Sequence, residues 1–183
     1  MFKTTQELEA GLGLIKISPK DRGIVELIVC RPGIGKREEL SEARLDIYSG
    51  LDGDNWLDRG DRHTVDKRAH PDMQLNLINS RVIALIAQTR ERWQLAGDQF
   101  YVDLDLSADN LPPGTLLLVA DAVIQVTAEP HLGCSKFTRR YGREATKFVN
   151  SKLGKSLNLR GINAKVITAG KVPLGAQINK ISG

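Results

Sequence analysis

The stretch from Val126 to Tyr141, VTAEPHLGCSKFTRRY, gathers residue types that can do chemistry within a short span. It holds the thiol of Cys134, with His131 three residues before it and several cations soon after it. A thiol acts as a nucleophile or a metal ligand in its thiolate form, which nearby positive charge and a helix N-terminus both stabilise. We therefore expect a functional cysteine at position 134; a buried, inert cysteine is the alternative that the residues alone leave open.

The residues around Cys134 also predict how its thiol is presented. AVIQVT, at positions 122–127, is typical of a strand, and Pro130 and Gly133 indicate a tight turn. We expect a short helix to begin near Cys134, with its first backbone N–H groups favouring an anion. Apolar residues recur beyond it at helical spacing, which predicts a face packed in the core. They are Phe137, Tyr141, Ala145 and Phe148.

Basic side chains of the C-terminal third suit a phosphate-bearing ligand, because guanidinium groups bind phosphate as a planar fork. The candidates are Lys136, Arg139, Arg140 and Arg160. His131 could take a proton from the thiol or from a substrate, or it could be hydrogen-bonded structure. Asn110 and Asn163 could donate amide hydrogen bonds to a ligand, or they could cap turns.

The charge of the chain is unevenly distributed. The net charge is +4, but residues 131–183 hold 11 Lys and Arg against one acid, whereas residues 1–130 hold 15 against 21. Such an asymmetry indicates an anionic partner near the C-terminal third, such as a phosphorylated cofactor, a small anion, an acidic protein or nucleic acid. A solvated basic face without a ligand is the alternative. Nucleic acid ranks below the others, because the region lacks paired aromatics for stacking and any nucleic-acid-binding motif.

The overall composition predicts one cytoplasmic globular domain over residues 1–183. A content of 41% hydrophobic residues in 183 can form a core. No apolar run approaches the roughly 18 residues needed to cross a bilayer, and the N-terminus lacks the apolar core of a signal peptide. Cys30 and Cys134 lie in unlike settings, so no disulfide framework is expected.

Apolar–polar alternation and turn residues predict about nine short strands. We expect them at 11–18, 23–30, 43–48, 74–78, 100–106, 115–119, 122–127, 162–168 and 177–181. Asn79 or Ser80 should cap a helix in RVIALIAQTRER, and Gly170 and Pro173 should form a turn. The tract from Ser49 to Asp72 should be irregular, with 58–71 mobile. Because strands follow one another by brief turns, the fold class is mainly β: an antiparallel barrel with two or three short helices.

Several other kinds of site find no support in the sequence. His63, His70, His131 and two distant cysteines lack the paired spacing of a zinc site, so no zinc is expected. No glycine loop of a nucleotide-binding type occurs. Asp103 and Asp105 share one face of a predicted strand, where they are expected to face solvent and not to act as an acid–base or metal pair.

An ordered set of segments in the C-terminal half resembles the MOSC domain, which also occurs at the C-terminus of molybdenum-cofactor sulfurases. The segments are VDLDLS at 102–107, NLPPGT at 110–115, PHLGCSKFTRRYG at 130–142, FVNS at 148–151 and LRGINAKVITAGKV at 159–172. The resemblance covers 102–172 best, with Gly53-Asp54 as a weaker match upstream. It implies a β-barrel fold of MOSC type and one functional cysteine, which maps onto Cys134.

The resemblance also implies a function. Members are thought to bind molybdenum cofactor (molybdopterin) with the cysteine as a molybdenum ligand, or to carry sulfur on it as a persulfide. Some reduce N-hydroxylated compounds. Soft thiolate suits an oxidised molybdenum–sulfur centre. The implied partners are a sulfur donor of the cysteine desulfurase kind or an electron-transfer protein, with no membrane.

The sequence departs from the family pattern at two places. Gly133 stands where many members have proline, and His70-Pro71-Asp72-Met73-Gln74 stands where many have a His-Gly-Gly tract. The expected function is thus cofactor binding or sulfur transfer through Cys134, as a molybdenum-cofactor-dependent oxidoreductase or a sulfur carrier. The alternative is a non-catalytic module whose basic C-terminal third docks an acidic protein or RNA.

Overall fold

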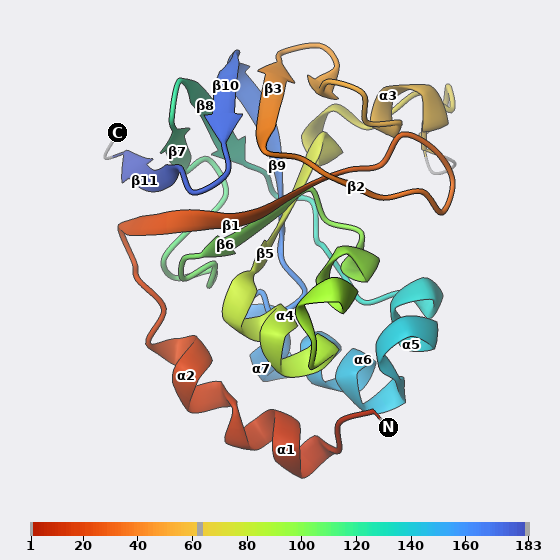
Figure 1. Cartoon of the computed structure of the whole chain (residues 1–183), viewed down its shortest axis with the longest axis vertical. Coiled ribbons are helices and arrows are strands. Elements are labelled where there is room, and N and C mark those ends of the chain that lie inside the picture. The colour runs from red at the N-terminus through yellow and green to blue at the C-terminus, as the bar shows by residue number, and fades with distance from the viewer. Residues whose placement is uncertain (1, 62–63, 182–183) are drawn as a thin grey trace.

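The structure is a computed structural model that describes residues 2–61 and 64–181. Within these residues, seven strands close into a barrel in the order β1, β11, β7, β8, β9, β5, β6 and back to β1 (Figure 1). They are β1 (Arg22–Cys30), β5 (Leu75–Asn79), β6 (Phe100–Asp103), β7 (Leu116–Val119), β8 (Ala122–Val126), β9 (Ile162–Thr168) and β11 (Gln177–Ile181). The barrel prediction is confirmed. All neighbouring pairs are antiparallel except β5 and β6, which run parallel.

The closing seam joins the first and the last strand of the barrel. Residues 22–24 of β1 pair with residues 177–179 of β11, while residues 24–28 pair with β6. Side chains that alternate inward along these strands fill the barrel, among them Val25, Val102 and Ile178. These positions are the apolar halves of the alternating runs in the sequence, which is why the pattern predicted the strands correctly.

A small second sheet lies against the barrel. Its strands lie in the order β10 (Gly170–Pro173), β3 (Glu42–Asp46) and β4 (Gly50–Leu51). The short strand β2 (Glu38–Glu39) pairs with the end of β1. The predicted turn at Gly170 and Pro173 is therefore wrong. Val172 pairs with Ala43 and both are fully buried, so burial of one apolar position outweighs the turn preference of the flanking residues.

Most helices gather at one end of the barrel, while α3 lies apart from them on the side of the small sheet (Figure 1). The described residues form seven α-helices, more than the two or three expected, and two 3₁₀ helices. They are α1 (Thr5–Ala10), α2 (Leu12–Lys16), α3 (Trp56–Arg59), η1 (Pro71–Met73), α4 (Ser80–Ala87), η2 (Arg90–Ala96), α5 (Ser135–Tyr141), α6 (Arg143–Asn150) and α7 (Lys152–Ser156). Asn79 caps α4 as predicted, through its side chain. Phe137 and Tyr141 pack with α4 and the outer face of β6 in a second core, which confirms the predicted apolar stripe.

The predicted strand at 11–18 is wrong, because this segment is helical. Thr4 and Glu7 form a capping box that starts α1, and each side chain bonds the other residue's backbone N–H. Leu8 and Ile15 are then buried in the second core. The helix within 11–18, α2, has no side-chain cap of its own, and burial of Ile15 in the second core outweighs the strand preference of the β-branched residues.

The tract from 49 to 72 is only partly irregular, since it contains β4, α3 and the start of η1, and Trp56 is buried. The mobility expected for 58–71 stays a prediction, and two of its residues lie outside the described ranges. No helix in the described part of the chain is both long and apolar enough to cross a membrane.

Candidate functional site

A pocket of about 490 Å³ opens beside the start of α5. Its wall is formed by the loop after β1, the end of η2, the segment before α5 and α5 itself. Cys134, His131, Lys136, Arg139 and Arg140 all line it. The structure therefore brings together five of the eight residues that the sequence nominated.

Cys134 is exposed and is the N-cap residue of α5, as predicted. Its position is fixed by the preceding residue: Gly133 N–H donates to Asn150 Oδ1 at 2.9 Å, and Asn150 Nδ2 donates back to the Gly133 carbonyl at 2.9 Å. A proline at 133 would have no N–H for the first of these bonds. A glycine at position 133 therefore allows the hydrogen bond by which Asn150, at the end of α6, holds the segment before Cys134.

The surroundings of Cys134 favour its thiolate. Partial burial raises the pKa of the Cys134 thiol, but backbone N–H groups of Phe137 and Lys136 and the charge of Arg160 lower it by more, so the net pKa lies below the ordinary value. In contrast, burial, followed by the charge of Asp54, raises the pKa of Cys30, which lies in the barrel core. The two cysteines thus differ in chemistry as well as in position.

The pocket is strongly cationic. Of the residues that the structure describes, six basic side chains line it and no carboxylate does. They are Arg31, Arg37, Arg59, Lys136, Arg139 and Arg140. Because like charges gathered around one cavity repel each other, an anionic ligand would be stabilised there.

Gly97 marks where two of these cations meet. A Cβ on Gly97 would lie 3.3 Å from Arg37 Nη2 and 3.9 Å from Arg140 Nη1, so both guanidinium groups flank the same open space. Burial, and then the charges of Arg140 and Arg31, lower the pKa of Arg37. Arg37 Nε is buried and has no partner among the described residues. We call this space the Gly97 seat.

Arg31 is held in a different way. Its guanidinium forms a buried pair with Asp54, with bonds of 2.8 Å from Nε and from Nη2, and donates through Nη1 to Asn76 Oδ1 and to the Gly97 carbonyl. Arg31 is therefore neutralised by Asp54, whereas Arg37 and Arg140 form no ion pair with any acid in the described residues. Arg37 and Arg140 therefore place uncompensated positive charge at the Gly97 seat.

His131 and Arg160 converge on one buried acid. Asp98, fully buried, accepts from His131 Nε2 at 2.7 Å and from Arg160 Nη1 at 2.8 and 2.9 Å. Burial alone would raise the pKa of Asp98, but Arg160 and His131 lower it to about 2. Burial and then Arg160 lower the pKa of His131, although Asp98 opposes both. Arg160 is buried behind the pocket and does not line it; its guanidinium lies 5.0 Å from the Phe137 ring centroid.

The two nominated asparagines do not line the pocket. Asn163 is fully buried and bridges Asn76 and the Glu129 carbonyl, so it supports the pocket wall from behind. Asn110 donates to the carbonyls of Lys20 and Asp105, away from the pocket. Their amide groups donate to backbone carbonyls, so the structure does not bring either side chain to the pocket, and the ligand contacts expected of both stay predictions.

The face shared by Asp103 and Asp105 holds no carboxylate pair either. Asp103 binds the guanidinium of Arg81, and Asp105 accepts from the backbone N–H of Ser107. No group of three His, Cys, Asp or Glu side chains placed to hold a metal ion occurs within residues 2–61 and 64–181.

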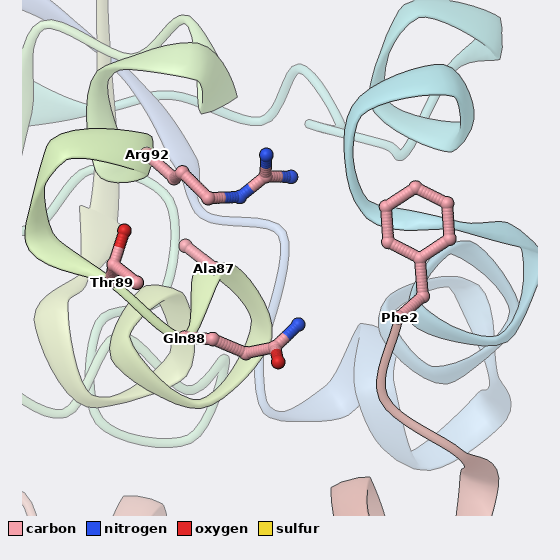
Figure 2. Close-up of a pocket in the computed structure, with 5 residues that line it drawn as sticks. All are labelled: Phe2, Ala87, Gln88, Thr89 and Arg92. Atoms are coloured by element: carbon pink, nitrogen blue, oxygen red, sulfur yellow. The ribbon is translucent and has the colours of Figure 1, made fainter.

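A second cavity, of about 390 Å³, lies between α4 and the N-terminal segment (Figure 2). Phe2 faces Arg92 and Gln88 across it. None of the described residues that line it has a thiol, imidazole or carboxylate, so they offer no group for acid–base or nucleophilic chemistry. The cavity beside Cys134 is therefore the candidate site.

The similarity of this chain to known proteins lies in its fold. No family model matches the sequence, and no curated protein matches it. The YuaD protein of Bacillus subtilis aligns with a TM-score of 0.62 at 16% identity, over 88% of this chain and 97% of that chain. YiiM of Escherichia coli aligns with a TM-score of 0.57 at 20% identity, over 87% of this chain and 70% of that chain. YiiM of Geobacillus stearothermophilus aligns with a TM-score of 0.58 at 15% identity, over 87% and 75%.

These neighbours are MOSC-domain proteins. The fold is of MOSC type. At such identities the likeness establishes the architecture of the MOSC-type barrel and leaves the ligand and the reaction to the residues of the pocket.

Proposed function

We propose that this chain is a MOSC-domain protein that binds molybdenum cofactor, with Cys134 as the thiolate ligand of molybdenum. The observation that carries the proposal is the composition of the pocket. Its described lining residues include the exposed Cys134 thiol, whose pKa is lowered, and six cations, but no carboxylate. A phosphate-bearing cofactor matches the cations, and a molybdenum–sulfur centre matches the soft thiolate.

The residues present fit this group. Arg37 and Arg140 would hold its phosphate at the Gly97 seat, because guanidinium groups without a carboxylate partner already flank that space. Two buried atoms at the pocket lack a partner among the described residues, Arg37 Nε and Asn55 Oδ1, and a ligand would satisfy one donor and one acceptor there. When bound, the cofactor would supply two-electron redox chemistry, for which reduction of N-hydroxylated compounds is the reaction class we propose.

Sulfur transfer is the second function that the same thiol supports. Cys134 is exposed and its thiolate is favoured, so it could attack the outer sulfur of a donor persulfide. The new S–S bond would form on Cys134 as the donor's S–S bond breaks, and the donor cysteine would leave as a thiolate. A cysteine desulfurase-like donor, or an electron-transfer protein for the reductase, would be the partner.

One experiment tests both functions. Wild type, Cys134→Ala and the matched control Cys30→Ala are purified from cells that make molybdenum cofactor, and molybdenum content and intact mass are measured. We expect molybdenum, or the mass of one added sulfur atom, in wild type and Cys30→Ala, and neither in Cys134→Ala. Equal loading of all three proteins would refute a role for Cys134.

The same preparations discriminate against a binding module without chemistry. Docking of an acidic protein or RNA on the basic C-terminal third would weaken steeply with salt and would be unchanged in Cys134→Ala. If such binding is the only activity found, the proposed cofactor and sulfur functions are both wrong.

A further inference from the structure

Asp98 is the most deeply buried acid beside the pocket, and it does not line the pocket itself. It lies between the end of η2 and the start of β6, and its side chain is fully buried. It gathers two residues from distant parts of the sequence, His131 and Arg160, through three hydrogen bonds. Burying a carboxylate lowers the stability of a protein unless the charge is paired, so its presence here indicates a functional role at this position.

The orientation of the His131 ring follows from two contacts. Nε2 lies 2.7 Å from Asp98 Oδ1, and Cδ2 lies 3.2 Å from the position that a Cβ on Gly161 would occupy. Both atoms belong to the same edge of the imidazole. The opposite edge carries Nδ1, which makes no hydrogen bond to the described residues, and His131 lines the pocket.

The proton on the ring is assigned by its partner. Asp98 is held ionised by Arg160, and an ionised carboxylate only accepts hydrogen bonds. The short contact to His131 therefore requires the proton on Nε2. A neutral imidazole has one such proton, so Nδ1 is left bare.

A bare Nδ1 would be unusual among the polar groups of this pocket. The six cations are donors only, and both amide atoms of Asn76 are already engaged by Arg31 and Asn163. Asn55 Oδ1 is the other acceptor without a partner among the described residues. An acceptor at position 131 thus joins Asn55 Oδ1 as a group that can accept a hydrogen bond from a ligand in a wall that is otherwise cationic.

We propose that Asp98 is a positioning residue that fixes His131 as the Nε2–H tautomer, so that Nδ1 presents an acceptor to an N–H or O–H group of the anionic ligand. The inference rests on the proposed function for the identity of the ligand, but the arrangement it assigns belongs to the protein alone. Arg160 completes the arrangement, since it keeps the carboxylate ionised and in place.

The test is the tautomeric state of His131 in the protein without ligand, read from the two-bond ¹H–¹⁵N correlations of its imidazole at neutral pH. The His131 signals are identified by their loss in His131→Gln. We expect a protonated Nε2 and a bare Nδ1 in wild type. A protonated Nδ1 in wild type would overturn the proposal without any variant.

Asp98→Asn tests the cause of this preference. An amide can offer either its oxygen or its nitrogen to the ring, so we expect the single tautomer to be lost. Asp103→Asn is the matched control, because Asp103 is also ion-paired to an arginine but lies outside the pocket, and it should leave His131 unchanged. Persistence of the wild-type tautomer in Asp98→Asn would contradict the inference.

A second pair of variants keeps the inference testable if Asp98→Asn does not fold. The side-chain amide of glutamine can stand in for Nε2 and donate to Asp98, whereas that of asparagine is too short to do so. We therefore expect His131→Gln to melt at a higher temperature than His131→Asn; the reverse order would overturn the proposal. Neither readout uses molybdenum, so failure of the proposed function, seen as no cofactor in wild type, is distinguishable from failure of this inference.

Discussion

Gly97→Ala places one methyl group in the space where Arg37 and Arg140 meet. Gly97 has φ +89°, so any side chain there adopts the left-handed region, at a cost of about 1–2 kcal/mol. In a chain of this size such a cost lowers the melting temperature by about 2–8 °C. The methyl would also lie 3.3 Å from Arg37 Nη2 and would occupy the Gly97 seat.

The effect on anion binding is expected to be larger than the effect on stability. A methyl group at this point keeps a ligand oxygen from at least one of the two guanidinium groups. Loss of one hydrogen bond to a charged group costs about 1.5–3 kcal/mol, which corresponds to a roughly ten- to hundredfold weaker affinity. The assay is calorimetric titration of inorganic phosphate at fixed ionic strength.

Gly114→Ala is the matched control for this prediction. Gly114 has φ +95°, but a Cβ there would meet no atom within 4 Å, and the residue does not line the pocket. The two variants therefore share the backbone cost and differ only in the pocket. Equal phosphate affinity in Gly97→Ala, Gly114→Ala and wild type would refute the assignment of the Gly97 seat.

Three further predictions follow from the same geometry. At neutral pH iodoacetamide should alkylate Cys134 in the folded protein and spare Cys30, because only Cys134 combines exposure with a lowered pKa; peptide mapping that finds equal labelling would contradict this. The pKa of about 2 for Asp98 lies below its ordinary value. Its contribution of about 2 kcal/mol to the free energy of unfolding should therefore be present above pH 4 and be lost as the pH falls towards 2. Denaturant titrations at several pH values check this prediction, and no loss of stability over this pH range would contradict it. Gly133→Pro should lower stability by about 1–3 kcal/mol, because Asn150 Oδ1 loses its donor; an unchanged melting temperature would argue against that support.

The strands were predictable because burial in a barrel imposes a period of two on each of them. Eight of the nine predicted strands form, and the same rule accounts for the misses. In 11–18, Leu12 and Ile15 are three residues apart and pack in the second core, whereas Leu14 and Ile17 are exposed, so the run of apolar residues did not reveal the helix. At Gly170–Pro173 a single buried residue, Val172, left too short a pattern to recognise.

The site was predictable only where its residues are close in sequence. Cys134, His131 and the cations of α5 form one segment, so their spacing placed them together. Arg31 and Gly97 come from separate segments and meet because β1 pairs with β6, with Val29 N–H bonded to the Gln99 carbonyl at 2.8 Å.

Asp98 gave one signal that could have been used. It is an acid that directly follows a glycine and precedes a strand, yet nothing in its neighbourhood reveals that Arg160 lies beside it. Such partners are set by the register of distant strands, which composition and spacing do not encode.

The seam between β1 and β11 has a consequence for how the protein is made. The first strand of the barrel must wait for the last, because Arg22 pairs with Asn179. While the ribosome is still adding residues 177–181, the hydrogen-bonding edge of β1 that will receive them is open to other chains. Synthesis therefore leaves a nearly complete barrel exposed along one edge until residues 177–181 emerge from the ribosome, and a chaperone that shields this edge would raise the yield of folded protein.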